Sequence, residues 1–183
     1  KSHFASTDVY NTGNDGNSWL NGGDSGWIGR FIEAYYYDLV EQSFPIGVEI
    51  GSKTGSLGFH GAQEHGLSIN IEGQDASGFY SILSGLGGEA PSYIPDSHYG
   101  EELQYIIDND QMSTLYSEAI SNAFNNGTNS SSYEDSDLSS QLKTVARLIS
   151  GGLQSKVYLV KLNGFDTHFN QIQSGNDIQG DHN

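Results

Sequence analysis

The feature that most constrains the fold is a helix–strand unit in the last third of the chain. Gly151 and Gly152 stand where the helix of this unit is expected to end, and Lys143 and Arg147 are expected to face solvent. The apolar run 157–162 then predicts a buried strand after a short turn. A helix followed at once by a buried strand is the repeating unit of a parallel α/β sheet. The helix is predicted from an apolar stripe at three- and four-residue spacing, made of Leu138, Leu142, Val145, Ile149 and Leu153.

The same periodicity predicts two more helices. One begins at Trp27, where Ser25 or Asp24 is expected to cap the first amides. The other runs from about 99 to 125, and the polar segment 125–135 after it is expected to be a flexible surface loop. The predicted apolar face of the first helix comprises Ile28, Phe31, Ile32, Tyr35 and Leu39.

A short strand is predicted at 46–50, directly after Pro45, and a second at 67–71, where apolar residues alternate with polar ones. A short helix is predicted at 77–86. These elements predict that residues 1–183 are part of a single α/β domain, a parallel sheet flanked by helices with a glycine-rich irregular insertion. Both ends are expected to be truncated, because the chain does not begin with Met and residues 175–183 carry no element that closes a domain.

The charge balance excludes some partners. The formal net charge is −16, from 23 acidic and 7 basic residues, so the chain lacks the cations that neutralise a nucleic-acid backbone. An anionic membrane surface repels it for the same reason. A cationic partner, a divalent metal or an extracellular setting fits this charge, and so does a simple role in solubility. Without cysteine there is no disulfide or thiolate chemistry, and no apolar run is long enough for a transmembrane helix.

The residues that carry chemistry follow the last predicted strand directly, as Asn163–Gly164–Phe165–Asp166–Thr167–His168. Ligands of open α/β sheets bind beyond the carboxyl ends of the strands. On extended backbone, Asp166 and His168 point to the same side and can share one cation. A carboxylate with an imidazole suits zinc, manganese or iron better than calcium, and Thr167 is a hydrogen-bond donor or a hydroxyl nucleophile. The competing interpretation is an Asp turn beside a surface histidine, because a catalytic metal usually needs three ligands.

These motifs resemble a secreted bacterial family known as domain of unknown function 1501. The similarity spans most of the chain, and its specific motifs lie near the two ends. They are Lys1–Phe4, Thr12–Gly13, Gly26–Arg30, Leu142–Leu153, Lys156–Val160 and Gly164–His168.

The resemblance implies a fold similar to alkaline phosphatases and sulfatases, and a secreted, periplasmic or cell-surface location. It implies a metal-dependent hydrolase of phosphate or sulfate esters acting on a small-molecule ester. Asp166 and His168 are then metal ligands, Thr167 a catalytic or supporting residue, and His3 a further candidate ligand. The family's Glu-Phe-Gly-Arg segment is not in this chain, and Asn163 replaces a glycine. Asp181–His182 is interpreted as a terminal tail and not as the family's Asp-His pair, so this metal centre is expected to be incomplete here.

Two other functions stay open. One is a non-catalytic surface or secretion-associated binding protein that keeps the fold, which the acidic surface rich in Tyr, Asn and Gly fits equally well. The other is a calcium-stabilised carbohydrate-binding module using Trp19, Trp27 and the tyrosines at 35–37, although such modules are rarely helical. His60 and His65 are further metal-ligand candidates, with surface turn histidines as the plainer interpretation.

Overall fold

The computed structural model describes residues 3–13, 25–39, 42–51, 56–62, 68–71, 91 and 93–162. The helical elements are α1 (His3–Thr12), α2 (Trp27–Tyr36), η2 (Tyr37–Leu39), η3 (Leu57–Phe59), α4 (His98–Asn126) and α5 (Asp137–Ser150). The strands are β1 (Gly47–Ile50), β2 (Ser68–Ile71) and β3 (Val157–Val160). The helix predicted at 77–86 lies outside the described residues.

The described strands form one parallel sheet in the order β2-β1-β3. Val48 in the central strand stands opposite Ile69 on one side and Tyr158 on the other. The chain therefore leaves β1 to form β2 and returns through α4 and α5 to form β3 on the other side. This arrangement confirms the predicted mixed α/β class with a parallel sheet.

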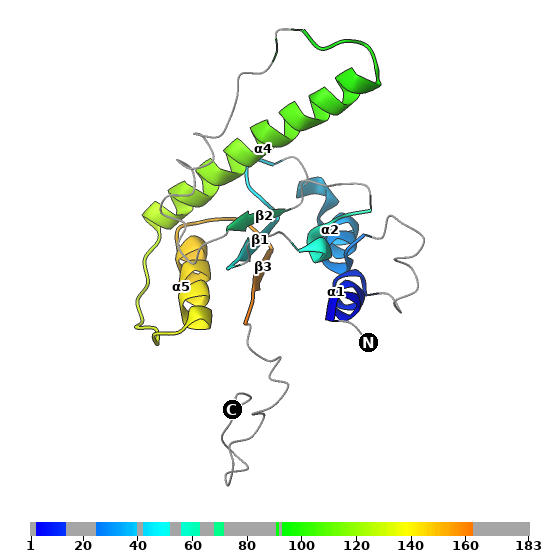
Figure 1. Ribbon diagram of the computed structural model, residues 1–183. Coiled ribbons are helices and arrows are strands. Elements are labelled where there is room, and N and C mark those ends of the chain that lie inside the picture. Colours follow the sequence, from blue (N-terminus) through cyan, green and yellow to red (C-terminus); the bar gives the residue numbers. More distant parts are fainter. Residues whose placement is uncertain are drawn as a thin grey trace.

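Helices cover both faces of the sheet, and Figure 1 shows the strands between α4 and α5 on one side and α1 and α2 on the other. Val48 and Ile50 pack against Ile120 of α4 and Leu148 of α5, all with 0% exposure. Burial of each such side chain contributes about 1.5–3 kcal/mol. A second core cluster lies on the α2 side and consists of Ile28, Ile32, Ile46 and Phe59.

The buried face of α5 differs from the predicted stripe. Leu148 is fully buried, together with Gln141 and Thr144, whereas Leu142 and Ile149 are 44% and 56% exposed. The predicted apolar stripe was therefore wrong at Leu142 and Ile149. The predicted glycine stop is confirmed, since the helix ends at Ser150 with Gly151 as its C-cap, and the Ser136 side chain caps the first turn.

Arg147 also differs from its predicted place in solvent. Its Nε donates to the backbone carbonyls of Phe124 (2.7 Å) and Gly127 (3.2 Å). Its guanidinium lies 4.0 Å from the centre of the Phe124 ring. The last carbonyls of a helix lack partners within the helix, so the end of α4 attracts this cation and draws it inward.

The start of α2 is built by close packing, and no described side chain caps it, so the predicted cap at Ser25 was wrong. The alternative cap, Asp24, lies outside the described residues. Gly26 occupies the capping position, and a side chain there would have its Cβ 2.1 Å from the carbonyl oxygens of Leu57 and Gly58. Ser25 accepts a hydrogen bond from Arg30 instead. The close approach of η3 therefore requires glycine where capping statistics favour serine.

The face of α2 is also narrower than predicted. Ile28 and Ile32 are buried, while Phe31 and Tyr35 are 40% and 72% exposed. Leu39 and Tyr36 are partly buried and pack against the core cluster. The apolar periodicity predicted the helix correctly, but two aromatic residues lie outside the contact with the sheet.

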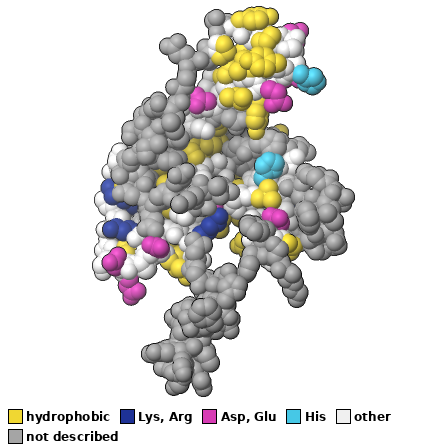
Figure 2. All heavy atoms as spheres, in the orientation of Figure 1, with side chains coloured by type: hydrophobic (Ala, Val, Ile, Leu, Met, Phe, Trp, Pro, Cys, Tyr) yellow, Lys and Arg dark blue, Asp and Glu magenta, His cyan; other side chains and the backbone are white. Residues whose placement is uncertain are grey.

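Helix α4 has a buried and an exposed half. Tyr116, Ile120 and Phe124 lie in the core, whereas Tyr99 and Ile106 are 69% and 61% exposed. Figure 2 shows hydrophobic side chains gathered with acidic ones at the end of the molecule where α4 begins. No helix in the described part of the chain is both long and apolar enough to cross a membrane.

The first residues of the connection between α4 and α5 are hydrogen-bonded to α5. The backbone N–H of Thr128 donates to the Ser150 hydroxyl (3.0 Å), and that hydroxyl donates to the Thr128 carbonyl (2.8 Å). Asn129 donates to the Lys143 carbonyl at 3.0 Å. The predicted flexibility of 125–135 stays a prediction, and these bonds limit it to the part after Asn129.

Candidate functional site at the carboxyl edge of the sheet

The structure leaves most of the predicted site residues undescribed. Asp166, Thr167 and His168 lie outside the described residues, and so does His65. His3 is the first residue of α1, but its side chain is not described. Their predicted roles as ligands or catalytic residues therefore stay predictions.

His182 also lies outside the described residues, and the two histidines whose side chains are described, His60 and His98, lie on the surface. His60 follows η3 and is exposed, and its backbone N–H closes the turn on Leu57. His98 begins α4, where its Nδ1 is 3.0 Å from Glu101 Oε2 and both side chains are exposed. Within the described ranges, no three His, Asp or Glu side chains gather as a metal site would require.

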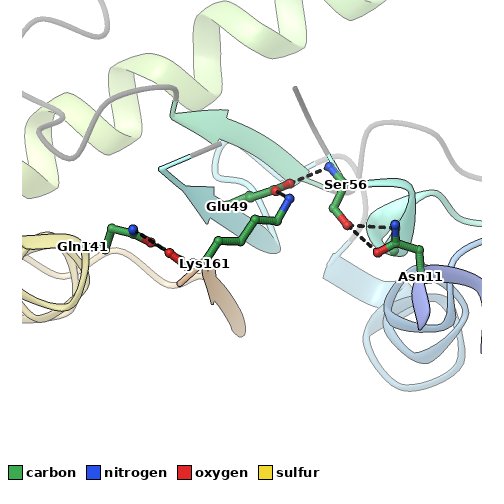
Figure 3. Close-up of polar contacts among 6 residues, drawn as sticks. Asn11, Glu49, Ser56, Gln141 and Lys161 are labelled. Carbon is green, nitrogen blue, oxygen red and sulfur yellow. Dashed lines mark hydrogen bonds and ion pairs between the residues drawn. The ribbon is translucent and has the colours of Figure 1, made fainter. Parts of the chain in front are cut away.

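A polar network that sequence reasoning missed crosses the carboxyl ends of β1 and β3. Its central residue is Glu49 of β1, which is 1% exposed. Glu49 Oε2 accepts from the backbone N–H of Ser56 at 2.6 Å, and Oε1 lies 2.5 Å from Nζ of Lys161. Lys161 is the first residue after β3, and its side chain is 35% exposed. We call Asn11, Glu49, Ser56, Gln141 and Lys161 the carboxyl-edge network (Figure 3).

The contact between Glu49 and Lys161 is an ion pair without a well-directed hydrogen bond. The atoms lie 2.5 Å apart, yet Oε1 accepts no hydrogen bond of acceptable angle from the described residues. At this distance the two charges are paired, so the Lys161 ammonium neutralises the Glu49 carboxylate. A buried carboxylate without such a partner would be strongly disfavoured.

Gln141 of α5 holds the backbone of Lys161. Its Oε1 accepts from the Lys161 N–H at 2.8 Å, and its Nε2 donates to the Lys161 carbonyl at 2.9 Å. The side-chain amide thus makes the pair of bonds that a neighbouring strand would make. Gln141 is only 3% exposed, so it satisfies backbone groups that would otherwise be buried without partners.

The exit of β1 is shaped to admit Gln141. Gly51 has φ +81°, and a Cβ there would lie 2.7 Å from Cδ of Gln141. Its N–H donates to the carbonyl of Ile71 in β2 at 3.1 Å. One glycine therefore lets the amide of Gln141 lie against the ends of both β1 and β3.

The network extends to α1 on the other face of the sheet. The Ser56 hydroxyl donates to Asn11 Oδ1 at 3.0 Å and accepts from the N–H of Gly58 at 3.1 Å. A continuous series of contacts thus runs from α1, over the strand ends, to α5. The signal for it in the sequence was a single acidic residue, Glu49, within the apolar run Ile46–Ile50.

A hollow lies at the opposite end of the sheet, before β1 and β3 begin. Its volume is about 200 Å³, and none of the described residues lining it is titratable. It is lined by Ser43, Phe44, Ala119, Asn122, Ala123, Asn126, Gly151, Gly152, Leu153 and Gln154. The described residues that line it therefore supply no titratable group.

Comparison with known proteins adds no relative: no protein-family model, curated protein or solved structure matches the chain. The resemblance to family 1501 therefore stays a prediction. What the structure establishes is a mixed α/β chain with helices around a small parallel sheet.

Proposed function

We propose that the protein is a secreted, periplasmic or cell-surface metal-dependent hydrolase of phosphate or sulfate esters, built on an alkaline-phosphatase-like fold. The observation that supports this most is the position of Lys161. It is held at the carboxyl edge of a parallel sheet, and it precedes Asp166 by five positions. The motif residues thus follow the strand end where ligands bind in open α/β sheets.

The described residues do not form a metal site by themselves, because Glu49 is already paired with Lys161 and no cluster of three ligand side chains lies among them. The proposed ligands are Asp166 and His168, with His3 as a third candidate. This donor set suits zinc, manganese or iron. A divalent cation supplies Lewis-acid chemistry to such a reaction by neutralising charge that develops on the transferring group.

The charge of the chain supports the need for a cation. With a net charge of −16, the protein repels an anionic ester at long range. Lys161 does not compensate for this, because Glu49 neutralises it. Hydrolysis breaks the P–O or S–O bond to the leaving alcohol, while water supplies the hydroxyl of the acid product and the proton of the alcohol. Thr167 is placed in this proposal as the hydroxyl beside the transferring group.

Metal analysis and assay of the same preparation test the proposal. We expect stoichiometric zinc, manganese or iron, and hydrolysis of 4-nitrophenyl phosphate or 4-nitrophenyl sulfate that a chelator abolishes. Asp166→Ala and His168→Ala should each lose the metal and the activity, and Thr167→Val should lose activity but keep the metal.

The matched control is His98→Ala, which removes an exposed histidine whose described partner is Glu101. It should keep both metal and activity. A folded wild-type protein that binds none of the three metals would refute the metallohydrolase.

A second function is favoured by a row of exposed aromatic residues on α2. Trp27, Phe31 and Tyr35 are 43%, 40% and 72% exposed and recur every four residues, so they share one face of the helix. The Phe31 and Tyr35 rings are 5.0 Å apart. This row suits the non-catalytic binding protein, because exposed aromatics supply contact area to partners or sugar rings.

Glycan-array binding tests this alternative. Phe31→Ala and Tyr35→Ala should abolish binding, while Tyr133→Ala, an exposed tyrosine in the α4–α5 connection, should not. Binding that a chelator removes would indicate the calcium-stabilised carbohydrate module.

A further inference from the structure

The carboxyl-edge network holds one residue, Lys161, at three points. Its N–H and its carbonyl both bond to Gln141, at 2.8 and 2.9 Å. Its ammonium is paired with Glu49 at 2.5 Å. A residue fixed at both backbone groups and at its side chain has little freedom in direction, whereas a chain leaving an edge strand is otherwise free to fray.

Both holding residues are polar side chains in buried places. Gln141 and Glu49 are 3% and 1% exposed. Burying a charged pair often stabilises no better than packing apolar residues of similar volume, and buried polar groups are retained in some proteins because they specify one arrangement. Both holding side chains act on the same residue, so position is what they specify.

We propose that Gln141 and Glu49 are positioning residues that set, through Lys161, where the chain leaves β3 toward Asp166, Thr167 and His168. The inference rests on the proposed function, because that function assigns these three residues to the active site. A metal centre needs its ligands placed within a few tenths of an ångström. Residues that orient ligands without touching the metal commonly change its affinity about 10- to 100-fold when substituted.

The neighbouring glycine agrees with this role. Gly51 leaves the space that Gln141 needs above the end of β1. The side-chain amide of Gln141 therefore lies against the ends of both β1 and β3. The position of Lys161 is therefore defined relative to the central strand of the sheet. It is set by the sheet as well as by its own strand.

Zn²⁺ affinity and trypsin cleavage after Lys161, measured on the same variants, test the inference. The variants are Gln141→Ala and Glu49→Gln, with Gln154→Ala as the control because Gln154 is exposed and far from Lys161 in the fold. We expect Zn²⁺ affinity to fall about 10- to 100-fold in the first two variants. We also expect cleavage after Lys161 to accelerate about tenfold, since proteolysis requires local opening.

Urea midpoints measured with chelator separate positioning from loss of stability. Positioning is supported if Gln141→Ala loses more Zn²⁺ affinity than its lower stability without metal can explain. An equal loss in Gln154→Ala would overturn it, as would wild-type Zn²⁺ affinity in both test variants. If Gln141→Ala does not fold, Glu49→Gln carries the same comparison.

The proposed function and the positioning role fail in different ways. A wild-type protein that binds no Zn²⁺, Mn²⁺ or Fe²⁺ refutes the hydrolase. Trypsin then decides the positioning role alone, and cleavage after Lys161 at the wild-type rate in both variants overturns it.

Discussion

The ammonium of Lys161 lies 2.5 Å from the buried carboxylate of Glu49, so an ion pair joins the end of β3 to the central strand of the sheet. The two partners are not equivalent. Glu49 is almost completely buried, while the Lys161 side chain is 35% exposed. Because of this difference in burial, substitution of Lys161 and substitution of Glu49 should lower the free energy of unfolding by different amounts.

Removing the lysine should cost more than removing the charge of the glutamate. Lys161→Met leaves a buried carboxylate without its cation, and breaking a buried pair in this way costs about 3–5 kcal/mol. Glu49→Gln leaves an ammonium that can turn toward water, so we expect roughly 1–2 kcal/mol. Urea unfolding of both variants measures the difference, with Lys156→Met as the exposed control. Equal losses would show that the carboxylate is not dependent on Lys161.

Gly51→Ala should destabilise the protein more than Gly152→Ala. Both glycines have positive φ, +81° and +90°, so each alanine pays a backbone strain of about 1–2 kcal/mol. Only at Gly51 does the new Cβ meet a neighbour, Gln141 at 2.7 Å, whereas nothing lies within 4 Å at Gly152. Thermal unfolding of the two variants therefore isolates the contact with Gln141. A larger loss in Gly152→Ala would contradict the packing at the strand ends.

Two leucines of α5 test which face of that helix is buried. Leu148 is fully buried and Leu142 is 44% exposed. Leu148→Ala should cost about 2–5 kcal/mol through lost burial and a cavity, and Leu142→Ala should cost less than about 1 kcal/mol. Chemical denaturation checks both values. The reverse order would restore the stripe predicted from periodicity.

Tyr158 should make stability fall at alkaline pH. Burial raises the pKa of its phenol above the ordinary value, and the Ser155 hydroxyl opposes this only in part. Ser155 donates its proton to the Pro45 carbonyl at 2.6 Å, and the Tyr158 oxygen has no hydrogen-bond partner among the described residues, so burial is the larger of the two causes.

The sign follows from which state releases its proton first. The Tyr158 phenol of the unfolded chain ionises at about pH 10, while the folded protein keeps the proton. The contribution of Tyr158 to the free energy of unfolding is therefore fully present below that pH. It is lost as the pH rises through the folded pKa. Tyr158→Phe should flatten this loss. Unfolding free energies from pH 8 to 11 for wild type and Tyr158→Phe measure it, and parallel curves would refute the raised pKa.

The sequence by itself determined most of the described helices and strands, although it did not predict α1 or η3. The helix–strand unit near the carboxyl end, the strands at β1 and β2 and the long helix α4 all follow from local periodicity, because a repeat of 3.6 or 2 residues is a property of the chain segment alone. The glycine stop after α5 follows likewise, since it satisfies backbone groups within a few residues. The parallel sheet was predictable from the order of these elements.

Tertiary structure alone decided which faces are buried and what meets at the strand ends. Phe31 and Leu142 fit an apolar stripe but are exposed, because α2 and α5 contact their neighbours along narrower faces. Arg147 turned inward because the end of α4 offers it carbonyl acceptors. Glu49 and Lys161 lie far apart in the sequence, and no local period relates them. Only the pairing of β1 with β3 brings their charges together, and the burial of Glu49 makes its carboxylate depend on Lys161.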